Sequence, residues 1–205
     1  NSQGLVITYD EVPVGSGITT DAQGGFKTSF VVPPSATGRH SIVVTGPNEF
    51  GIPTSDIGFQ VSPTIEIDNA NGSPGDEVTV KGSGFGVNEK NISLTYANAR
   101  LPVAVAADAA GSFEVIVTVP SSAKGVHTIQ AIGPITASAA RPKQSYVIGP
   151  ILALSKSTGH VAMGVEVRGR GFEPLSTVDL NVSDVRQASL VTDDTGSFEF
   201  TDKIP

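Results

Sequence analysis

The chain of 205 residues contains no cysteine, no tryptophan and a single methionine. The lack of cysteine excludes disulfides, thiolate nucleophiles and metal sites built on Cys ligands. Charged residues make up only 16% of the chain. Even so, no apolar run approaches the roughly 18 residues that a membrane-spanning helix requires. We therefore expect no direct insertion into a membrane.

Basic residues are also scarce, because 13 Lys and Arg stand against 20 Asp and Glu, for a net charge of −7. They are scattered along the chain, whereas a nucleic-acid-binding protein gathers them on one surface. The same balance argues against an anionic membrane surface as a partner. We expect no nucleic-acid partner, and an acidic exterior rich in Ser and Thr suits an extracellular protein.

The sequence is rich in glycine and proline, with 23 and 14 residues, and one of its turns occurs three times. Asp21–Phe26 (DAQGGF) recurs as Asp108–Phe113 (DAAGSF) and as Asp193–Phe198 (DDTGSF), at offsets of 87 and 85 residues. Self-similarity at this period indicates a tandem array of like domains.

The repeat predicts one complete unit between two partial ones. Pro63 and Pro150 each end a strand-like run and cannot donate to a continuing ladder, so they mark the boundaries. Either the chain is a mature subunit whose ends complete one another between molecules, or the stretch belongs to a longer polypeptide. The expected ranges are 1–63 (second part of a unit), 64–150 (complete unit) and 151–205 (first part of a unit).

The complete unit reads as about seven short strands with apolar residues at every second position, as in Val78 and Val80. This number of strands between regular turns is typical of a sandwich. The sequence therefore predicts an all-β fold of tandem immunoglobulin-like β-sandwich domains with a repeat of about 87 residues. The expected strands cover residues 64–67, 77–81, 91–96, 101–107, 113–119, 125–132 and 144–148.

One residue of the last copy departs from this alternation. Asp202 stands where the position of Val117 predicts an inward apolar residue. A bulge or an altered last domain would each accommodate it.

Two segments carry a family resemblance. Ser73–Gly86 (SPGDEVTVKGSGFG) resembles the opening of IPT/TIG-type immunoglobulin-like domains, in which a G-x-G-F turn follows the second strand. Asp108–Gly125 is similar to the tail of immunoglobulin-like repeats in bacterial and archaeal cell-surface proteins. The partial units share the resemblance through the repeat, although His160–Met163 replaces Ser73–Asp76 in the last copy. The resemblance implies a β-sandwich in an extracytoplasmic setting, without implying a ligand.

Within this motif, Gly82–Gly86 is expected to form a turn. Glycine there can take a positive φ, and Phe85 can fold beneath the loop. The segment lacks the Lys and the following helix of a phosphate-binding loop, so we interpret it as structural.

Of the three histidines, His40 and His127 are equivalent in the repeat, and His160 lies in the last copy. A repeated metal ligand or proton carrier is one interpretation. The other is a half-buried ring near a strand start that bonds a neighbouring backbone group, as a corner tyrosine does in other sandwiches. One histidine per domain cannot make a zinc site alone, so we expect the second.

The repeated aspartates Asp21, Asp108 and Asp193 offer a similar choice. Calcium needs six to eight oxygen ligands, and the first two turns supply one carboxylate each. An aspartate that opens a turn can instead bond the backbone two residues on, and we expect this structural role. The other acids are dispersed, and no Ser/His/Asp elbow occurs. A calcium site at a domain junction that uses Asp68 and Asp76 stays an unsupported alternative. We therefore predict no enzyme, no cofactor and no metal site.

Sugar binding and glycosylation are the remaining site hypotheses. Tyr9, Tyr96 and Tyr146 fall on inward-facing positions, so the sequence offers no aromatic platform for a glycan ligand, which stays an unsupported alternative. Three Asn-x-Ser sequons mark candidate N-glycosylation sites in a secreted protein. These sites are Asn71, Asn91 and Asn181.

These observations predict a non-catalytic extracellular structural or assembly protein. As a tandem immunoglobulin-like array it would form a cell-surface stalk, layer or filament, with copies of itself or neighbouring repeats of the same polypeptide as partners. The alternatives are an adhesin or glycan-binding module, and an accessory region of a larger secreted enzyme.

Overall fold

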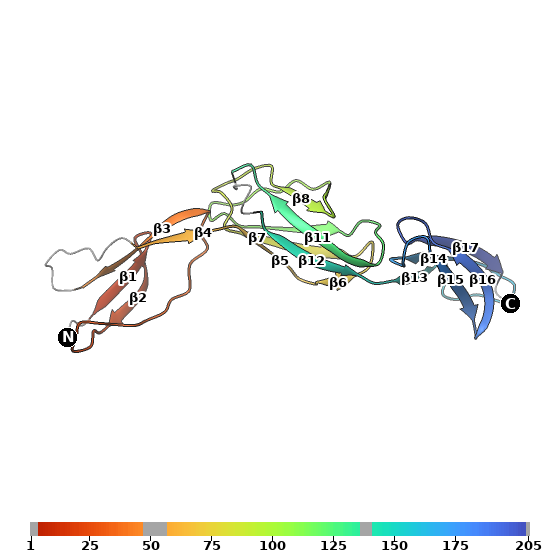
Figure 1. The fold of residues 1–205 in the computed structure, drawn as a ribbon, viewed down its shortest axis with the longest axis horizontal. Helices are drawn as coiled ribbons and strands as arrows, with labels where there is room; N and C mark the ends of the chain where they lie inside the picture. Colours follow the sequence, from red (N-terminus) through yellow and green to blue (C-terminus); the bar gives the residue numbers. More distant parts are fainter. Residues whose placement is uncertain (1–3, 47–56, 136–140, 204–205) are drawn as a thin grey trace.

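The computed structural model of the chain describes residues 4–46, 57–135 and 141–203. These ranges contain strands, turns and loops and no helix, which confirms the all-β prediction. Figure 1 shows an elongated molecule in which three groups of strands follow one another, with the two termini at opposite ends. No helix among the described residues is long and apolar enough to cross a membrane.

The first group is a four-stranded antiparallel sheet, the N-terminal sheet, with the order β2-β1-β3-β4. Its inner face carries the alternating buried side chains of β1, among them Leu5, Ile7 and Tyr9. Residues 26–31, equivalent to the middle strand at residues 113–118, form no strand here. The described part of this sheet contains no counterpart of the strand Glu77–Ser83, with which residues 113–118 pair. The strands are β1 (Leu5–Tyr9), β2 (Val12–Ile18), β3 (Gly38–Thr45) and β4 (Ile57–Val61).

The second group is the middle sandwich, formed by two facing sheets with the orders β10-β7-β5 and β6-β12-β11-β8-β9. Its core is one cluster of inward side chains from both sheets, and Val80, Leu94, Ile129 and Tyr146 are completely buried in it. The strands are β5 (Thr64–Ile67), β6 (Asn71–Gly72), β7 (Glu77–Ser83), β8 (Ser93–Tyr96), β9 (Ala99–Arg100), β10 (Phe113–Thr118), β11 (Gly125–Ile132) and β12 (Lys143–Ile148).

One expected strand of the middle sandwich is wrong. Residues 101–107 form an irregular segment joined to the sheet through a single bridge between Ile92 and Val105. Pro102 supplies no N–H for a ladder. Leu101 and Val105 nevertheless reach the core from this loop, so the alternation identified buried side chains correctly but not their backbone.

The third group, the C-terminal sheets, repeats the first half of the middle sandwich. The pair Ile151–Arg170 has the same place in its ladder as the pair Thr64–Ser83 has in the middle sandwich. One sheet has the order β13-β14-β17, and the other pairs β15 with β16. The strands are β13 (Ile151–Leu154), β14 (Gly164–Arg170), β15 (Thr177–Val182), β16 (Val185–Val191) and β17 (Phe198–Lys203).

Asp202 is accommodated without a bulge. It pairs with Val165 in an unbroken ladder, as Val117 pairs with Val78 in the middle sandwich. Its neighbourhood differs, because Asp202 lines an open cavity of about 310 Å³ between the two C-terminal sheets. Of the two alternatives, the structure therefore supports an altered last domain and not a bulge.

Candidate functional site

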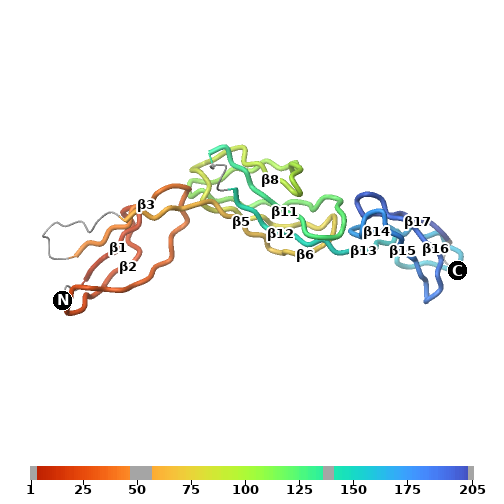
Figure 2. Tube along the Cα trace, in the orientation of Figure 1, coloured from red at the N-terminus to blue at the C-terminus, as the bar shows by residue number. Residues whose placement is uncertain are grey.

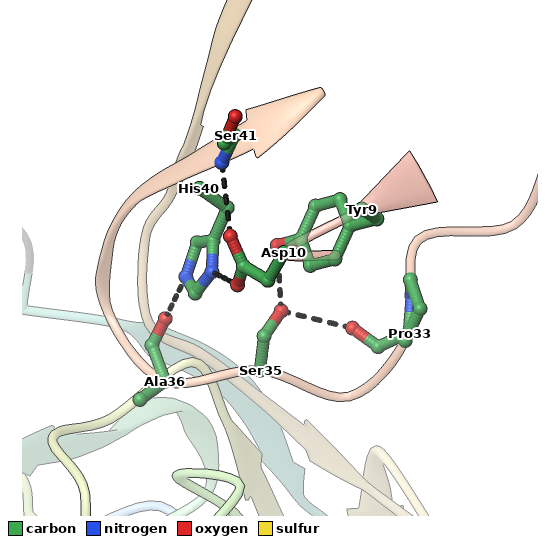
Figure 3. Close-up of polar contacts among 7 residues, drawn as sticks. All are labelled: Tyr9, Asp10, Pro33, Ser35, Ala36, His40 and Ser41. Carbon is green, nitrogen blue, oxygen red and sulfur yellow. Dashed lines mark hydrogen bonds and ion pairs between the residues drawn. The ribbon is translucent and has the colours of Figure 1, made fainter. Parts of the chain in front are cut away.

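A cluster of a tyrosine, a serine and a histidine recurs at an offset of 87 residues, and we call it the corner. In the N-terminal sheet it consists of Tyr9 at the end of β1, His40 in β3 and Ser35 in the loop before β3 (Figure 3). In the middle sandwich it consists of the equivalent residues Tyr96, His127 and Ser122. The cross-strand register brings each tyrosine and histidine together.

In the first corner, the Ser35 hydroxyl lies 2.8 Å from the Tyr9 hydroxyl and donates to the Pro33 carbonyl at 2.9 Å (Figure 3). Because Ser35 donates its single hydroxyl proton to the Pro33 carbonyl, the tyrosine hydroxyl is the donor to Ser35. The rings of Tyr9 and His40 stack with their centroids 5.1 Å apart. The loop before β3 is thereby tied to the end of β1.

The second corner has the same geometry. The hydroxyls of Tyr96 and Ser122 lie 3.0 Å apart, and Ser122 donates to the Pro120 carbonyl at 3.0 Å. The rings of Tyr96 and His127 stack at 5.2 Å. Burial of the Tyr96 ring raises the pKa of its hydroxyl, which therefore stays a donor at neutral pH.

Each histidine also bonds the backbone of the loop. Nε2 of His40 lies 2.8 Å from the Ala36 carbonyl oxygen, and Nε2 of His127 lies 2.8 Å from that of Ala123. Both rings are partly buried. The expectation of a histidine that bonds a neighbouring backbone group is confirmed in both copies. His160 is exposed, and its Nδ1 lies 3.0 Å from the Val161 carbonyl.

The two corners differ in the turn that follows the tyrosine, which is Asp10–Glu11 in the first and Ala97–Asn98 in the second. Asp10 occupies the position that Ala97 holds in the second corner, at the start of the two-residue turn after the tyrosine. Nδ1 of His40 lies 2.5 Å from Oδ2 of Asp10, and the Ser41 amide donates to Oδ1 at 2.9 Å (Figure 3). The backbone of the turn is the same, with φ of 46° at Asp10 and 47° at Ala97.

This pair perturbs both titrations. Partial burial acts to lower the pKa of His40, but the hydrogen bonds to Asp10 and to the Ala36 carbonyl outweigh it and raise the pKa above 6.5. The hydrogen bond from His40, with that from Ser41, holds the pKa of Asp10 below 3.8. At pH values between the lowered pKa of Asp10 and the raised pKa of His40, the favoured state is therefore an imidazolium paired with a carboxylate.

The residue types Ser, His and Asp do not form a nucleophilic triad here. A triad requires the histidine to face the serine hydroxyl, whereas the two nitrogens of His40 face Asp10 and the Ala36 carbonyl. Ser35 is bonded to Tyr9 and Pro33. The arrangement orders a loop and provides no activated hydroxyl.

The loop that the corner holds is also the point of contact with the next group of strands. We call residues 33–37 and 120–124 the joint loops. The Thr37 amide donates to the Phe85 carbonyl of the middle sandwich at 2.8 Å, and the Lys124 amide donates to the Phe172 carbonyl of the C-terminal sheets at 3.0 Å. The chain itself passes with little linker from β4 to β5 and from β12 to β13 (Figure 2).

Gly84 and Gly171 allow the chain to pass close to this contact. Their φ angles are 71° and 70°. A Cβ on Gly84 would lie 2.7 Å from the Ser62 carbonyl oxygen, and one on Gly171 would lie 2.5 Å from that of Gly149. Phe85 is completely buried. Gly82 and Ser83 still belong to β7, so the turn expected at Gly82–Gly86 is confined to Gly84–Gly86. This turn also joins neighbouring groups, through the Phe85 carbonyl.

The repeated aspartates have the structural role that the sequence predicted. Oδ1 of Asp108 accepts the backbone N–H of Ala110 and of Ser112, both at 2.8 Å. Asp21 accepts the equivalent pair at 2.9 and 2.7 Å, and Asp193 at 2.9 and 2.8 Å. Hydrogen bonds from Ser197 and Thr195 lower the pKa of Asp193.

The three sequon asparagines are exposed and are not brought together. Asn71 lies in the edge strand β6, and Asn91 lies two residues before β8 in the same sheet, with β12 and β11 between those strands. Asn181 lies in β15. The three tyrosines have the inward positions expected, with Tyr146 completely buried and Tyr9 and Tyr96 buried in the corners.

Two site residues escaped sequence reasoning. Asp10 could have been found by setting the turn of Asp10 beside that of Ala97, since the adjoining histidines are aligned. Glu89 is 1% exposed and accepts the Gly86 amide at 2.7 Å and the Ile135 amide at 2.6 Å. Nothing in the local pattern distinguishes this buried acid from an exposed one.

Comparison with known proteins bears on the middle sandwich most directly. Residues 63–139 match the model of the IPT/TIG domain. None of the curated protein sequences compared with the chain matches it.

Two solved structures match the chain at low similarity. The central fibronectin-III array of RIM-binding protein has 8% identity and a TM-score of 0.31, over 99% of this chain and 76% of that one. SGBP-B of the Bacteroides ovatus mixed-linkage glucan utilization locus, in complex with a mixed-linkage heptasaccharide, has 10% identity and a TM-score of 0.35. That match covers 96% of this chain, which spans 59% of the other. Likeness at this level carries no argument about ligands or partners.

Proposed function

We propose that this chain, whose middle sandwich is an IPT/TIG domain, is part of a non-catalytic extracellular array of β-sandwiches that serves as a stiff stalk, layer or filament. The observation that carries the proposal is the recurrence of one joint. At both junctions the loop of one group donates the same backbone hydrogen bond to the turn of the next.

A recurring joint gives an array a fixed step from unit to unit. In repeat proteins each unit contacts its neighbours, and a constant interface produces a regular superstructure. Flexibly linked domains would not require a glycine such as Gly171 to make room for the Gly149 carbonyl. We propose the unit boundaries given by the repeat, namely residues 1–63, 64–150 and 151–205.

We further propose that the partners of this array are like units, from the same polypeptide or from second copies. The C-terminal sheets leave Leu152 and Leu154 about half exposed, at 53% and 56%. Ile65, the equivalent of Leu152, is buried in the middle sandwich against a facing sheet that includes β11 and β12. Strands of the same kind fit this open face.

The extracellular setting gives the exposed asparagines a role as glycosylation sites. We propose Asn71, Asn91 and Asn181 as candidate acceptors, since a sequon must be accessible to be modified. Mass spectrometry of peptides from the native protein tests each site separately.

Immunogold labelling of intact cells, with antibodies against this chain, tests the proposed function. Label on the outer surface that protease shaving removes is the expected result, and label that appears only after permeabilisation contradicts the proposal. Negative-stain microscopy of the purified chain tests the partners. Ordered filaments or sheets support assembly through like units, and a monomer at all concentrations contradicts assembly between separate copies.

A further inference from the structure

We propose that His40 and His127 position the joint loops to receive the next group of strands, and that the hydrogen bond from His40 to its loop, unlike that from His127, is lost at alkaline pH. The inference rests on the proposed function, because it concerns the joints of the array.

Corner and joint share three consecutive residues. Ser35 belongs to the corner, the Ala36 carbonyl accepts Nε2 of His40, and the Thr37 amide donates to Phe85 across the junction. The same sequence of contacts occurs in the second joint loop. The histidine therefore fixes the peptide unit whose N–H makes the bond between neighbours.

His40 lies between two acceptors. Its Nδ1 faces the carboxylate of Asp10 and its Nε2 faces the Ala36 carbonyl. A neutral imidazole carries one N–H, so only the imidazolium donates to both. When the ring is neutral, its proton faces the carboxylate, because a hydrogen bond to a charged acceptor is the stronger one. The other nitrogen then turns a lone pair towards the carbonyl oxygen, and the loop loses its hydrogen bond from the histidine, while the bond between Tyr9 and Ser35 remains.

His127 has no such conflict. Ala97 stands in place of the carboxylate, while the stacked tyrosine and the carbonyl acceptor are retained. A neutral ring protonated on Nε2 satisfies the Ala123 carbonyl completely. The second joint thus keeps its anchor without a charge on the histidine.

The direction of the pH dependence follows from the protonation of His40. Because the pKa of His40 is raised, its hydrogen bond to the Ala36 carbonyl is fully formed below about pH 6.5 and is lost as the pH rises through that raised pKa. At low pH Asp10 becomes neutral, but the ring keeps both protons and the carbonyl keeps its donor. The first joint loop, residues 33–37, has no titratable side chain, and β4 has none either. The titratable and charged groups on the surrounding elements are Asp10 and Glu11 of the β1–β2 turn, Tyr9 of β1, Arg39 of β3 and Asp108 of the turn that meets Ala36.

The lack of native cysteine allows pairs of spin labels to report on each joint. Ser16, Ser145 and Thr177 are exposed strand residues, one in each group. The pair S16C/S145C spans the first joint, and the pair S145C/T177C spans the second. Distance distributions are measured on the full chain at about pH 5.5 and pH 9, on either side of the histidine titration.

We expect the first distribution to be narrow at acid pH and to become about twofold broader at alkaline pH, while the second keeps its width. D10A should abolish this response, and A97D should transfer it to the second joint. H127F, which keeps the stacked ring but lacks the donor, should broaden the second distribution at both pH values.

A first joint with the same width at both pH values, or a response that survives D10A, overturns the inference and leaves the proposed stiff array intact. Broad distributions at both joints already at acid pH overturn the proposed function instead. Hydrogen exchange of the β1 and β3 amides separates a loosened joint from an unfolded sheet. Loss of protection throughout these strands at alkaline pH would also contradict the inference.

Discussion

Nδ1 of His40 lies 2.5 Å from a carboxylate oxygen of Asp10, with the opposite ring nitrogen bonded to the backbone of the loop that joins the next group of strands. The titratable pair of His40 and Asp10 is therefore bonded directly to the joint loop of residues 33–37. Because the following repeat has the same stacked ring and the same bond from histidine to backbone carbonyl without the carboxylate, the chain contains its own comparison.

The protonation states of the two histidines can be read directly. We expect the nitrogen chemical shifts of His40 to show an imidazolium at pH 6, and the Nδ1–H tautomer once the ring is neutral. His127, when neutral, should show the Nε2–H tautomer that its bond to Ala123 requires. Long-range proton–nitrogen NMR spectra distinguish the two tautomers. The same tautomer on both neutral rings would contradict the assignment.

Replacing Asp10 with alanine should lower the stability of the N-terminal sheet over a limited pH range. The contribution of His40 is present below about 6.5 and lost above its raised pKa, and that of Asp10 is present above about 3.8 and lost below its lowered pKa. The difference between wild type and D10A should therefore be largest from pH 4 to 6.5. Since Asp10 is 47% exposed, we expect about 1 kcal/mol or less.

Amide exchange of β3 residues across this pH range measures the effect. The Ser41 amide, which donates to Asp10 in the wild type, should lose the most protection. A difference that grows steadily towards alkaline pH would have the wrong sign for this pair.

Substituting Gly171 with alanine should weaken the second joint. The residue has φ of 70°, and the new Cβ would lie 2.5 Å from the Gly149 carbonyl oxygen. Strain of this kind costs about 2 kcal/mol, part of which the joint can relieve by opening. The S145C/T177C distance distribution and thermal unfolding report the two contributions.

Gly149 provides the matched control for this substitution. A Cβ on Gly149 meets no atom within 4 Å, and its φ lies outside the left-handed region. G149A should therefore leave the distance distribution unchanged. If G171A behaves in the same way, the close approach at the junction does not hold the two groups together.

Glu89 should be indispensable for the middle sandwich despite its charge. Its two carboxylate oxygens accept the Gly86 and Ile135 amides in a buried position. Glutamine of the same shape would turn an N–H group towards one of these donors, at a cost of about 2 kcal/mol. Urea unfolding should show this loss for E89Q and almost none for E114Q, whose side chain is 62% exposed. Equal stabilities would show that the buried carboxylate is dispensable.

Much of the fold could be predicted from the sequence, because its repeats encode the same ladders with the same side chains. Alternation at Val78 and Val80 identified a buried strand face, and Gly84 identified a turn with positive φ. The segment 101–107 shows the limit of this reasoning. Apolar residues can reach a core from a loop, so a pattern of burial does not by itself establish a ladder.

The candidate site could be predicted only in part. A histidine bonded to the backbone follows from the position of His40 near a strand start. The bond from Thr37 to Phe85 joins residues of different units, and neither residue type signals a contact between amide and carbonyl groups. Backbone interactions of this kind depend on how two units meet, which the composition of each unit does not specify.

Residual dipolar couplings of the aligned chain test the central claim, a fixed joint at each junction, most directly. We expect the amides of all three groups, measured at about pH 5.5 where His40 is charged, to fit a single alignment tensor in the arrangement of Figure 1. Three tensors of different magnitude would mean that the groups reorient independently. That result would contradict a stiff array.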